Sequence, residues 1–99
     1  MTFPADRTTS YRIAPHVMFE ELGHEIVLLD MEKGMYFGLN ATGKLIWQEL
    51  RQGASVEQLA ARLAELAEDR ARVEVDLRAF LADLDKRGLI TREPPAHAG

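Results

Sequence analysis

The sequence predicts an α+β domain, and two observations support this fold class. Before residue 40, short segments of alternating apolar and polar residues read as strands, whereas after it apolar residues recur at every third or fourth position, as in helices. Strands that precede the helices, rather than alternate with them, are typical of the α+β class. The chain has 99 residues, 46% hydrophobic and 28% charged, so one soluble domain with a modest core is expected.

The expected strands are VMFEEL (residues 17–22), EIVLLD (25–30) and MYFGL (35–39). Gly23 stands at the first central position of a two-residue turn, which suits a type II′ hairpin. In the next turn, residues 31–34, Gly34 is expected to adopt a positive φ, which places Asp30 opposite Met35. The three strands therefore form an antiparallel meander whose last strand is a free edge.

Alternation along these strands divides their side chains between two faces. The core face is predicted to hold Val17, Phe19, Ile26, Leu28, Met35, Phe37 and Leu39. The opposite face mixes apolar and charged groups, and its residues are Glu20, Val27, Leu29, Gly34, Tyr36 and Gly38. In this set, Tyr36 stands between two glycines. Because glycine weakens a strand, this row raises the question of what needs so much room beside it.

A first helix is expected through residues 41–52, with Asn40 as its N-cap and Gly53 after its end. Its core positions are Ile46 and Leu50, with Leu45 or Trp47 beside them. Ser55 and Gln58 have the spacing of a capping box at the start of a second helix. The apolar positions of that helix are Val56, Leu59, Ala60, Leu63 and Leu66.

The third helix is expected to begin near Ala71 or Val73 and to end before Gly88, the natural C′ residue. Its apolar stripe is Val73, Leu77, Phe80, Leu81 and Leu84. A loose segment of residues 1–14 and a loose tail of residues 93–99 are expected to flank a domain of residues 15–92. A three-stranded meander followed by three helices has the outline of a winged helix-turn-helix, which by itself fixes no function.

No catalytic or metal-binding machinery is visible in the sequence. There is no cysteine, and no two of the three histidines have the i, i+4 spacing of a helical metal site. Neither serine lies in a nucleophile elbow, and GMYFG lacks the strand–turn–helix order of a phosphate loop. We therefore expect no enzymatic activity, cofactor or metal. The absence of a signal-peptide pattern and of a membrane-length apolar run predicts a cytoplasmic protein without membrane contact.

Charge argues against nucleic acid as a partner. The net charge is −4 and the pI near 5.3. From residue 68 to residue 87, the third helix and its start carry five basic against six acidic residues, whereas a DNA-reading helix needs a basic face. A small winged-helix transcription regulator remains the main alternative function, and a cryptic enzyme subunit is a third.

The free edge strand, residues 35–39, is the feature that a purely structural role explains least. Its glycines allow another backbone to approach, and its outer backbone groups are available for pairing. The simple alternative is an edge strand that merely packs against the third helix. The functional hypothesis is β-augmentation, in which an extended peptide pairs with the edge and places apolar side chains beside the third helix. Proline at Met35 or Phe37 is expected to remove a bond to that peptide, at whichever of the two points its N–H outward.

Three stretches of the sequence, LLDMEKGMYFGLNATGKLIWQEL, SVEQLAARL and VDLRAFLADLDKRGLI, resemble the PqqD-like proteins, the RiPP recognition elements. The resemblance covers about residues 17–90. Within that family the hairpin is most similar to the stand-alone leader-binding subunits of lasso-peptide biosynthesis. In pyrroloquinoline quinone biosynthesis proper, a different second hairpin is expected. A PqqD-like chaperone in another peptide-modification pathway is the alternative within the family.

The resemblance implies a non-catalytic adaptor that holds the leader of a ribosomally synthesised precursor peptide and presents it to a leader peptidase. The implied partners are the precursor peptide and a separate peptidase of cysteine-protease type, with the macrolactam cyclase as a further candidate. The leader is implied to pair with the third strand and to pack against one side of the third helix. The implied site residues are Lys33, Gly34, Met35, Tyr36, Phe37, Gly38, Leu39, Asp76, Phe80, Asp83 and Arg87.

Overall fold

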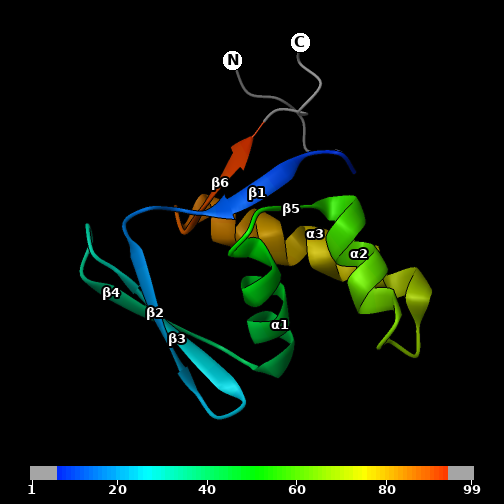
Figure 1. The fold of residues 1–99 in the computed structure, drawn as a ribbon, viewed down its shortest axis with the longest axis horizontal. Coiled ribbons are helices and arrows are strands. Elements are labelled where there is room, and N and C mark those ends of the chain that lie inside the picture. The colour runs from blue at the N-terminus through cyan, green and yellow to red at the C-terminus, as the bar shows by residue number, and fades with distance from the viewer. Residues whose placement is uncertain (1–6, 94–99) are drawn as a thin grey trace.

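The computed structural model describes residues 7–93 and has the predicted α+β fold (Figure 1). Its elements follow one another as β1 (Ser10–Ile13), β2 (Val17–Leu22), β3 (Glu25–Asp30), β4 (Met35–Leu39), α1 (Ala41–Leu50), β5 (Ala54–Ser55), α2 (Val56–Ala64), α3 (Arg70–Lys86) and β6 (Ile90–Glu93). Strands β2, β3 and β4 form one antiparallel sheet in that order. Figure 1 shows the three helices to one side of this sheet.

The meander has the predicted register. Asp30 pairs with Met35, and in the first hairpin Leu22 pairs with Glu25 across the two-residue turn. Gly23 has φ 63° and is the only residue of that turn with a positive φ, as a type II′ turn requires. Gly34 has φ 67° and belongs to the second turn, before β4 begins at Met35. Of the predicted row of Gly34, Tyr36 and Gly38, only Tyr36 and Gly38 therefore lie on the outer face of the strand.

The core lies between the predicted face of the meander and the helices. Ile26 and Leu28 are fully buried against α1, whose Trp47 is also fully buried and meets the ring of Phe19 edge-on with centroids 5.9 Å apart. Trp47, rather than Leu45, thus accompanies the core positions of α1. Met35 has the parity of the core face but lies beyond the core, with 49% of its surface exposed.

The caps that the sequence predicted define the helix ends. The Asn40 side chain accepts a hydrogen bond from the N–H of Gly43, and Ser55 forms a capping box with Gln58. At the C-terminus of α3, Gly88 has φ 76°, and the N–H of Leu89 bonds back to the carbonyl of Leu84 in a Schellman motif. α3 begins at Arg70, slightly before the expected start.

A second small sheet, in the order β5-β1-β6, was not predicted. Residues 10–13 were expected to lie in a loose segment of residues 1–14, and for them this expectation is wrong. They form β1, whose Tyr11 is buried, because two partners distant in sequence flank it. Burial raises the pKa of Tyr11 above the ordinary tyrosine value. Glu93 closes β6, and residues 94–99 lie outside the described residues.

Leu66, like Met35, was expected in the core but is exposed. Leu66 follows the end of α2 and shows 67% of its surface, because the helix stops at Ala64 and the periodicity no longer applies. Within residues 7–93, no helix is long and apolar enough to cross a membrane.

Candidate functional site

The outer edge of β4 exposes the backbone of Tyr36 and Gly38. Residues that flank a two-residue hairpin turn exchange both hydrogen bonds, so Leu22 and Glu25 are such a pair and pairs alternate from there. Along β3, every second residue from Ile26 to Asp30 therefore bonds to β4, where its partners are Leu39, Phe37 and Met35. The intervening N–H and C=O groups of β4 point away from the sheet.

This alternation corrects one expectation. Met35 and Phe37 have the same parity, so both direct their N–H groups toward β3 and neither can lose a bond to an added peptide. Tyr36 and Gly38 are the positions where proline would remove an outward donor. At the other edge strand of the sheet, β2, two side chains from α1 and its C-cap make contacts. Gln48 donates a hydrogen bond to Glu21, and the Arg51 guanidinium lies 5.3 Å from the centroid of the Phe19 ring.

A groove of about 800 Å³ begins at the free edge, next to Gly38, and runs between α1, α2 and α3. Its apolar lining includes Leu39, Leu45, Leu63, Leu66, Val73 and Phe80. Asp69, Asp76 and Asp83 bring carboxylates to the rim, where Arg72 lies 3.6 Å from Asp76. An extended peptide on β4 would therefore find an apolar groove directly beside it.

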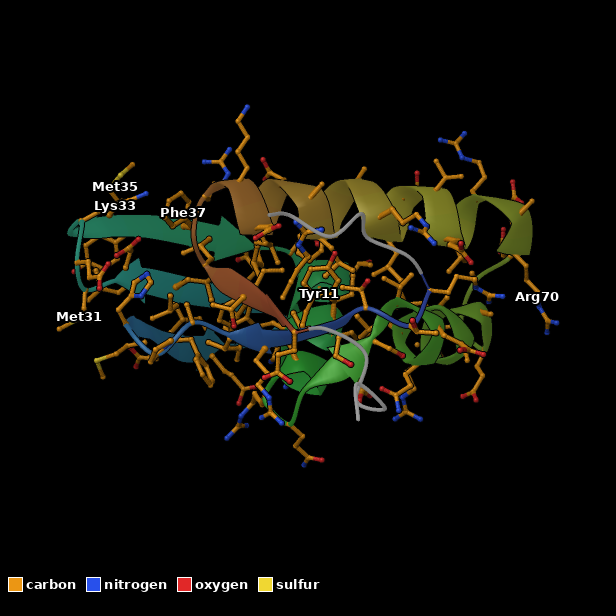
Figure 2. The ribbon with its side chains drawn as sticks, turned by 90° about the horizontal axis from the view of Figure 1, so that it is seen from above. Tyr11, Met31, Lys33, Met35, Phe37 and Arg70 are labelled. Atoms are coloured by element: carbon orange, nitrogen blue, oxygen red, sulfur yellow. The ribbon has the colours of Figure 1, made fainter. Side chains whose placement is uncertain are left out.

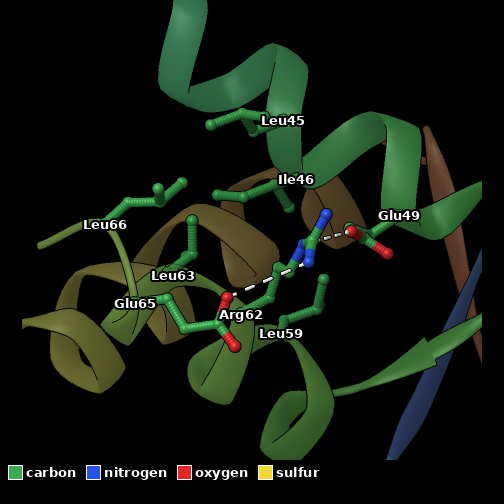
Figure 3. A pocket seen from close by; sticks show the side chains of 8 residues that line it. All are labelled: Leu45, Ile46, Glu49, Leu59, Arg62, Leu63, Glu65 and Leu66. Atoms are coloured by element: carbon green, nitrogen blue, oxygen red, sulfur yellow. Dashed lines mark ion pairs between the residues drawn. The ribbon is translucent and has the colours of Figure 1, made fainter.

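A smaller hollow of about 160 Å³ continues this groove between α1 and α2 (Figure 3). Four of its residues also line the larger groove: Leu45, Ile46, Leu63 and Leu66. Arg62 closes its outer side through ion pairs with Glu49 at 3.0 Å and Glu65 at 3.9 Å. The partial exposure of Leu45 and Leu66 is thus explained by their position in a hollow, not in the core.

Gly43 allows α1, β4 and α3 to meet at the floor of the groove. A Cβ at this position would lie 3.0 Å from the Cβ of Leu39 and 3.3 Å from the ring tip of Phe80. Both distances are tighter than nine in ten real Cβ contacts, so a side chain here would require Leu39 or Phe80 to shift by a few tenths of an ångström. The absence of a side chain at Gly43 therefore shapes the junction on which Phe80 rests.

The turn before β4 is held by Asp30, whose side chain is completely buried. Its Oδ1 accepts hydrogen bonds from the N–H groups of Lys33 and Glu32, at 3.0 and 2.9 Å. The bond from Lys33 contributes most to lowering the pKa of Asp30; burial opposes it, and the bond from Glu32 and the charges of His16 and Lys33 lower the pKa further. This carboxylate sets the point where β4 starts.

The turn end of β4 is closed against the C-terminus of α3. Figure 2 shows Lys33 and Met35 at the tip of the hairpin and Phe37 beside the end of α3. The Nζ of Lys33 donates to the carbonyl of Arg87 at 3.5 Å, and the Arg87 guanidinium lies 5.3 Å from the centroid of the Phe37 ring. Arg87 also pairs with Asp83 at 3.0 Å. A bound peptide therefore has more room toward Leu39 than toward the hairpin tip.

The structure divides the residues expected at the site into three groups. Those that line the groove are Gly38, Leu39, Asp76, Phe80 and Asp83. Those at its closed end are Lys33, Phe37 and Arg87, whereas Gly34, Met35 and Tyr36 lie at the hairpin tip or on the outer face. The sequence analysis missed that α1 and α2 also line the groove. Apolar residues on these two helices that lie outside the predicted core positions could have indicated it.

Charged residues on α3 are mostly engaged with one another. Arg72, Arg78 and Arg87 each pair with a carboxylate one helical turn away. Such a surface offers little free positive charge to a phosphate backbone. In the described part of the chain, no three histidine or acidic side chains gather where they could hold a metal ion.

Comparison with known proteins gives one family and two similar solved structures. Residues 25–90 match the family described as "Coenzyme PQQ synthesis protein D (PqqD)". A structure described as "TbiB1 in Complex with the TbiA(beta) Leader Peptide" is 36% identical with a TM-score of 0.75, over 80% of this chain and 93% of that one. Another, "Lasso peptide synthetase B1 complexed with the leader peptide", is 32% identical with a TM-score of 0.74, over 82% and 96%. The curated proteins give no match.

The family match begins at β3 and ends at the start of β6, so it includes β4, all three helices and the groove between them. The two structural matches cover 80% and 82% of the chain. The chain therefore belongs to the PqqD family.

Proposed function

We propose that this protein is a non-catalytic adaptor that binds the leader segment of a ribosomally synthesised precursor peptide of the lasso class. One observation carries the proposal: within residues 7–93 the outer edge of β4 has no partner strand, and it opens directly onto an apolar groove of about 800 Å³. The two similar structures support the same class of ligand, because both are described as complexes with a leader peptide and one of them as a lasso peptide synthetase B1. Both are more than 30% identical to this chain.

In the proposed complex, the leader adds as a fourth strand beside β4. Its backbone pairs with the outward N–H and C=O groups of Tyr36 and Gly38, which supplies affinity that is largely blind to sequence. Alternate leader side chains enter the groove and contact Leu39 and Phe80. Beyond Leu39 the leader continues over Leu45 and the hollow between α1 and α2, where apolar side chains are accommodated.

The adaptor is proposed to work by raising the effective concentration of the precursor at a separate processing enzyme. That partner is a leader peptidase of cysteine-protease type, with the macrolactam cyclase as a further candidate. Cleavage should therefore accelerate most at low precursor concentration, where tethering matters most. The adaptor alone should cleave nothing, since no nucleophile with its base is evident in the sequence.

The proposal is tested by identifying a short precursor gene beside the gene of this protein, titrating the protein into the fluorescein-labelled synthetic leader of that precursor and recording fluorescence anisotropy. Saturable binding is expected, with a scrambled leader as control. Phe80→Ala should weaken binding. Because Phe80 is partly buried against the core, its truncation should also cost some stability, less than the roughly 3–5 kcal/mol of a fully buried phenylalanine, so a melting curve must show that the variant is folded. Absence of binding to the wild-type protein, or equal binding of the scrambled peptide, would contradict the proposal.

A further inference from the structure

The face of the β2–β3–β4 sheet that points away from the helices carries an exposed apolar row. Met18, Leu29 and Tyr36 are cross-strand neighbours on it, and Met18 and Tyr36 expose 59% and 71% of their surface. Leu22 on the same face is 53% exposed. We call this surface the outer sheet face; its residues are Met18, Glu20, Leu22, Glu25, Val27, Leu29, Tyr36 and Gly38.

The charges on the outer sheet face have one sign. Glu20 lies beside Val27 and Glu25 beside Leu22, and within residues 7–93 neither carboxylate has an ion pair. None of the three strands contains a lysine or an arginine. The surface is therefore apolar at its centre with unneutralised negative charge beside it, which fits a partner with apolar side chains and a basic rim.

A strand added to β4 would extend this same face. Because strand side chains alternate, every second leader residue would lie on the outer sheet face next to Tyr36 and Gly38. Gly38 leaves space there, since a Cβ at its position would meet nothing within 4 Å. The occupied face would thus combine leader and adaptor side chains, and a protein docked on it would touch both.

We propose that the outer sheet face is the docking surface for the enzyme that processes the bound precursor, and that this enzyme presents apolar side chains rimmed by lysine or arginine. The inference rests on the proposed function. A second copy of this chain is a poorer occupant, because a symmetric contact would bring the carboxylates of Glu20 and Glu25 close to their counterparts. An anionic membrane surface would be repelled by the same charges.

The test uses Met18→Lys and Glu20→Lys, which lie on β2, two strands away from the leader edge. Glu57→Lys makes the same charge change as the second variant at an exposed position of α2 and is the control. Binding of the purified leader peptidase from the same gene cluster is measured by biolayer interferometry with synthetic leader present, and leader affinity by anisotropy. Each β2 variant should weaken peptidase binding about tenfold or more, with leader affinity unchanged. The control should change neither.

The outcomes separate this inference from the proposed function. If the wild-type protein does not bind the leader, the proposed function fails. If leader binding is intact but both β2 variants bind the peptidase as tightly as the control, the outer sheet face is not the docking surface. Sedimentation that shows a dimer broken by Glu20→Lys would also overturn the inference, since a second copy would then occupy the face. Retained leader binding shows that each variant is folded.

Discussion

Single residues fix the start of the binding edge and the floor of the groove. Asp30 is a buried carboxylate whose two backbone hydrogen bonds shape the turn that precedes β4. Gly43 allows Leu39 and Phe80 to approach α1. The sequence pattern placed Asp30 opposite Met35 but could not reveal that its side chain is buried. Nor could it single out Gly43, because one of the two close contacts there comes from Phe80, which is distant in the chain.

Asp30→Asn should destabilise the protein at neutral pH, because it removes a charge that the turn amides stabilise. The pKa of Asp30 is lowered in the folded state from its ordinary value of 3.8. The contribution of the carboxylate is therefore complete above the unfolded-state pKa and is lost as pH falls through the lower folded-state pKa. Urea midpoints of wild type and variant should converge as the pH is lowered from about 7 to about 3. A gap that stays constant over this range would show that the charge of Asp30 does not stabilise the turn.

At the level of elements, local signals predicted more than non-local ones. Asn40, Ser55 and Gly88 each mark a helix end through bonds within a few residues, and all three were found where expected. β1 was missed because Tyr11 pairs with residue 54 and with residue 92, and no local pattern carries that information. The site shows the same division: the edge strand was predicted, whereas the hollow between α1 and α2 depends on how helices pack.

Because successive N–H groups of β4 alternate between facing β3 and facing outward, two neighbouring proline variants form a matched pair. Gly38→Pro should retain the fold, because its N–H points away from the sheet and proline is tolerated at such an edge position, yet it should weaken leader binding by removing one donor. Phe37→Pro removes an N–H that bonds to β3 and should lower the melting temperature. Leader affinity and melting curves of both variants check this. The assignment of outward positions would be wrong if Gly38→Pro melted early and Phe37→Pro did not.

In the whole molecule, the parts that stabilise the fold are different from the parts proposed to bind the leader. The core lies between the helices and the inner face of the meander, and the small sheet of β1, β5 and β6 holds the two ends of the described chain together. In the described part of the chain, this arrangement leaves β4 with one edge unpaired and a groove beside it. The central claim is that a leader peptide completes this edge as an additional strand.

Residue-resolved amide hydrogen exchange, followed by NMR with and without a saturating synthetic leader, tests this claim most directly. Strand addition predicts that the amides of Tyr36 and Gly38 gain strong protection when the leader is bound. The amides of Met35, Phe37 and Leu39 already bond to β3, so their protection should rise much less. If the leader binds but the amides of Tyr36 and Gly38 exchange as fast as in the free protein, the peptide does not pair with β4 and the account is contradicted.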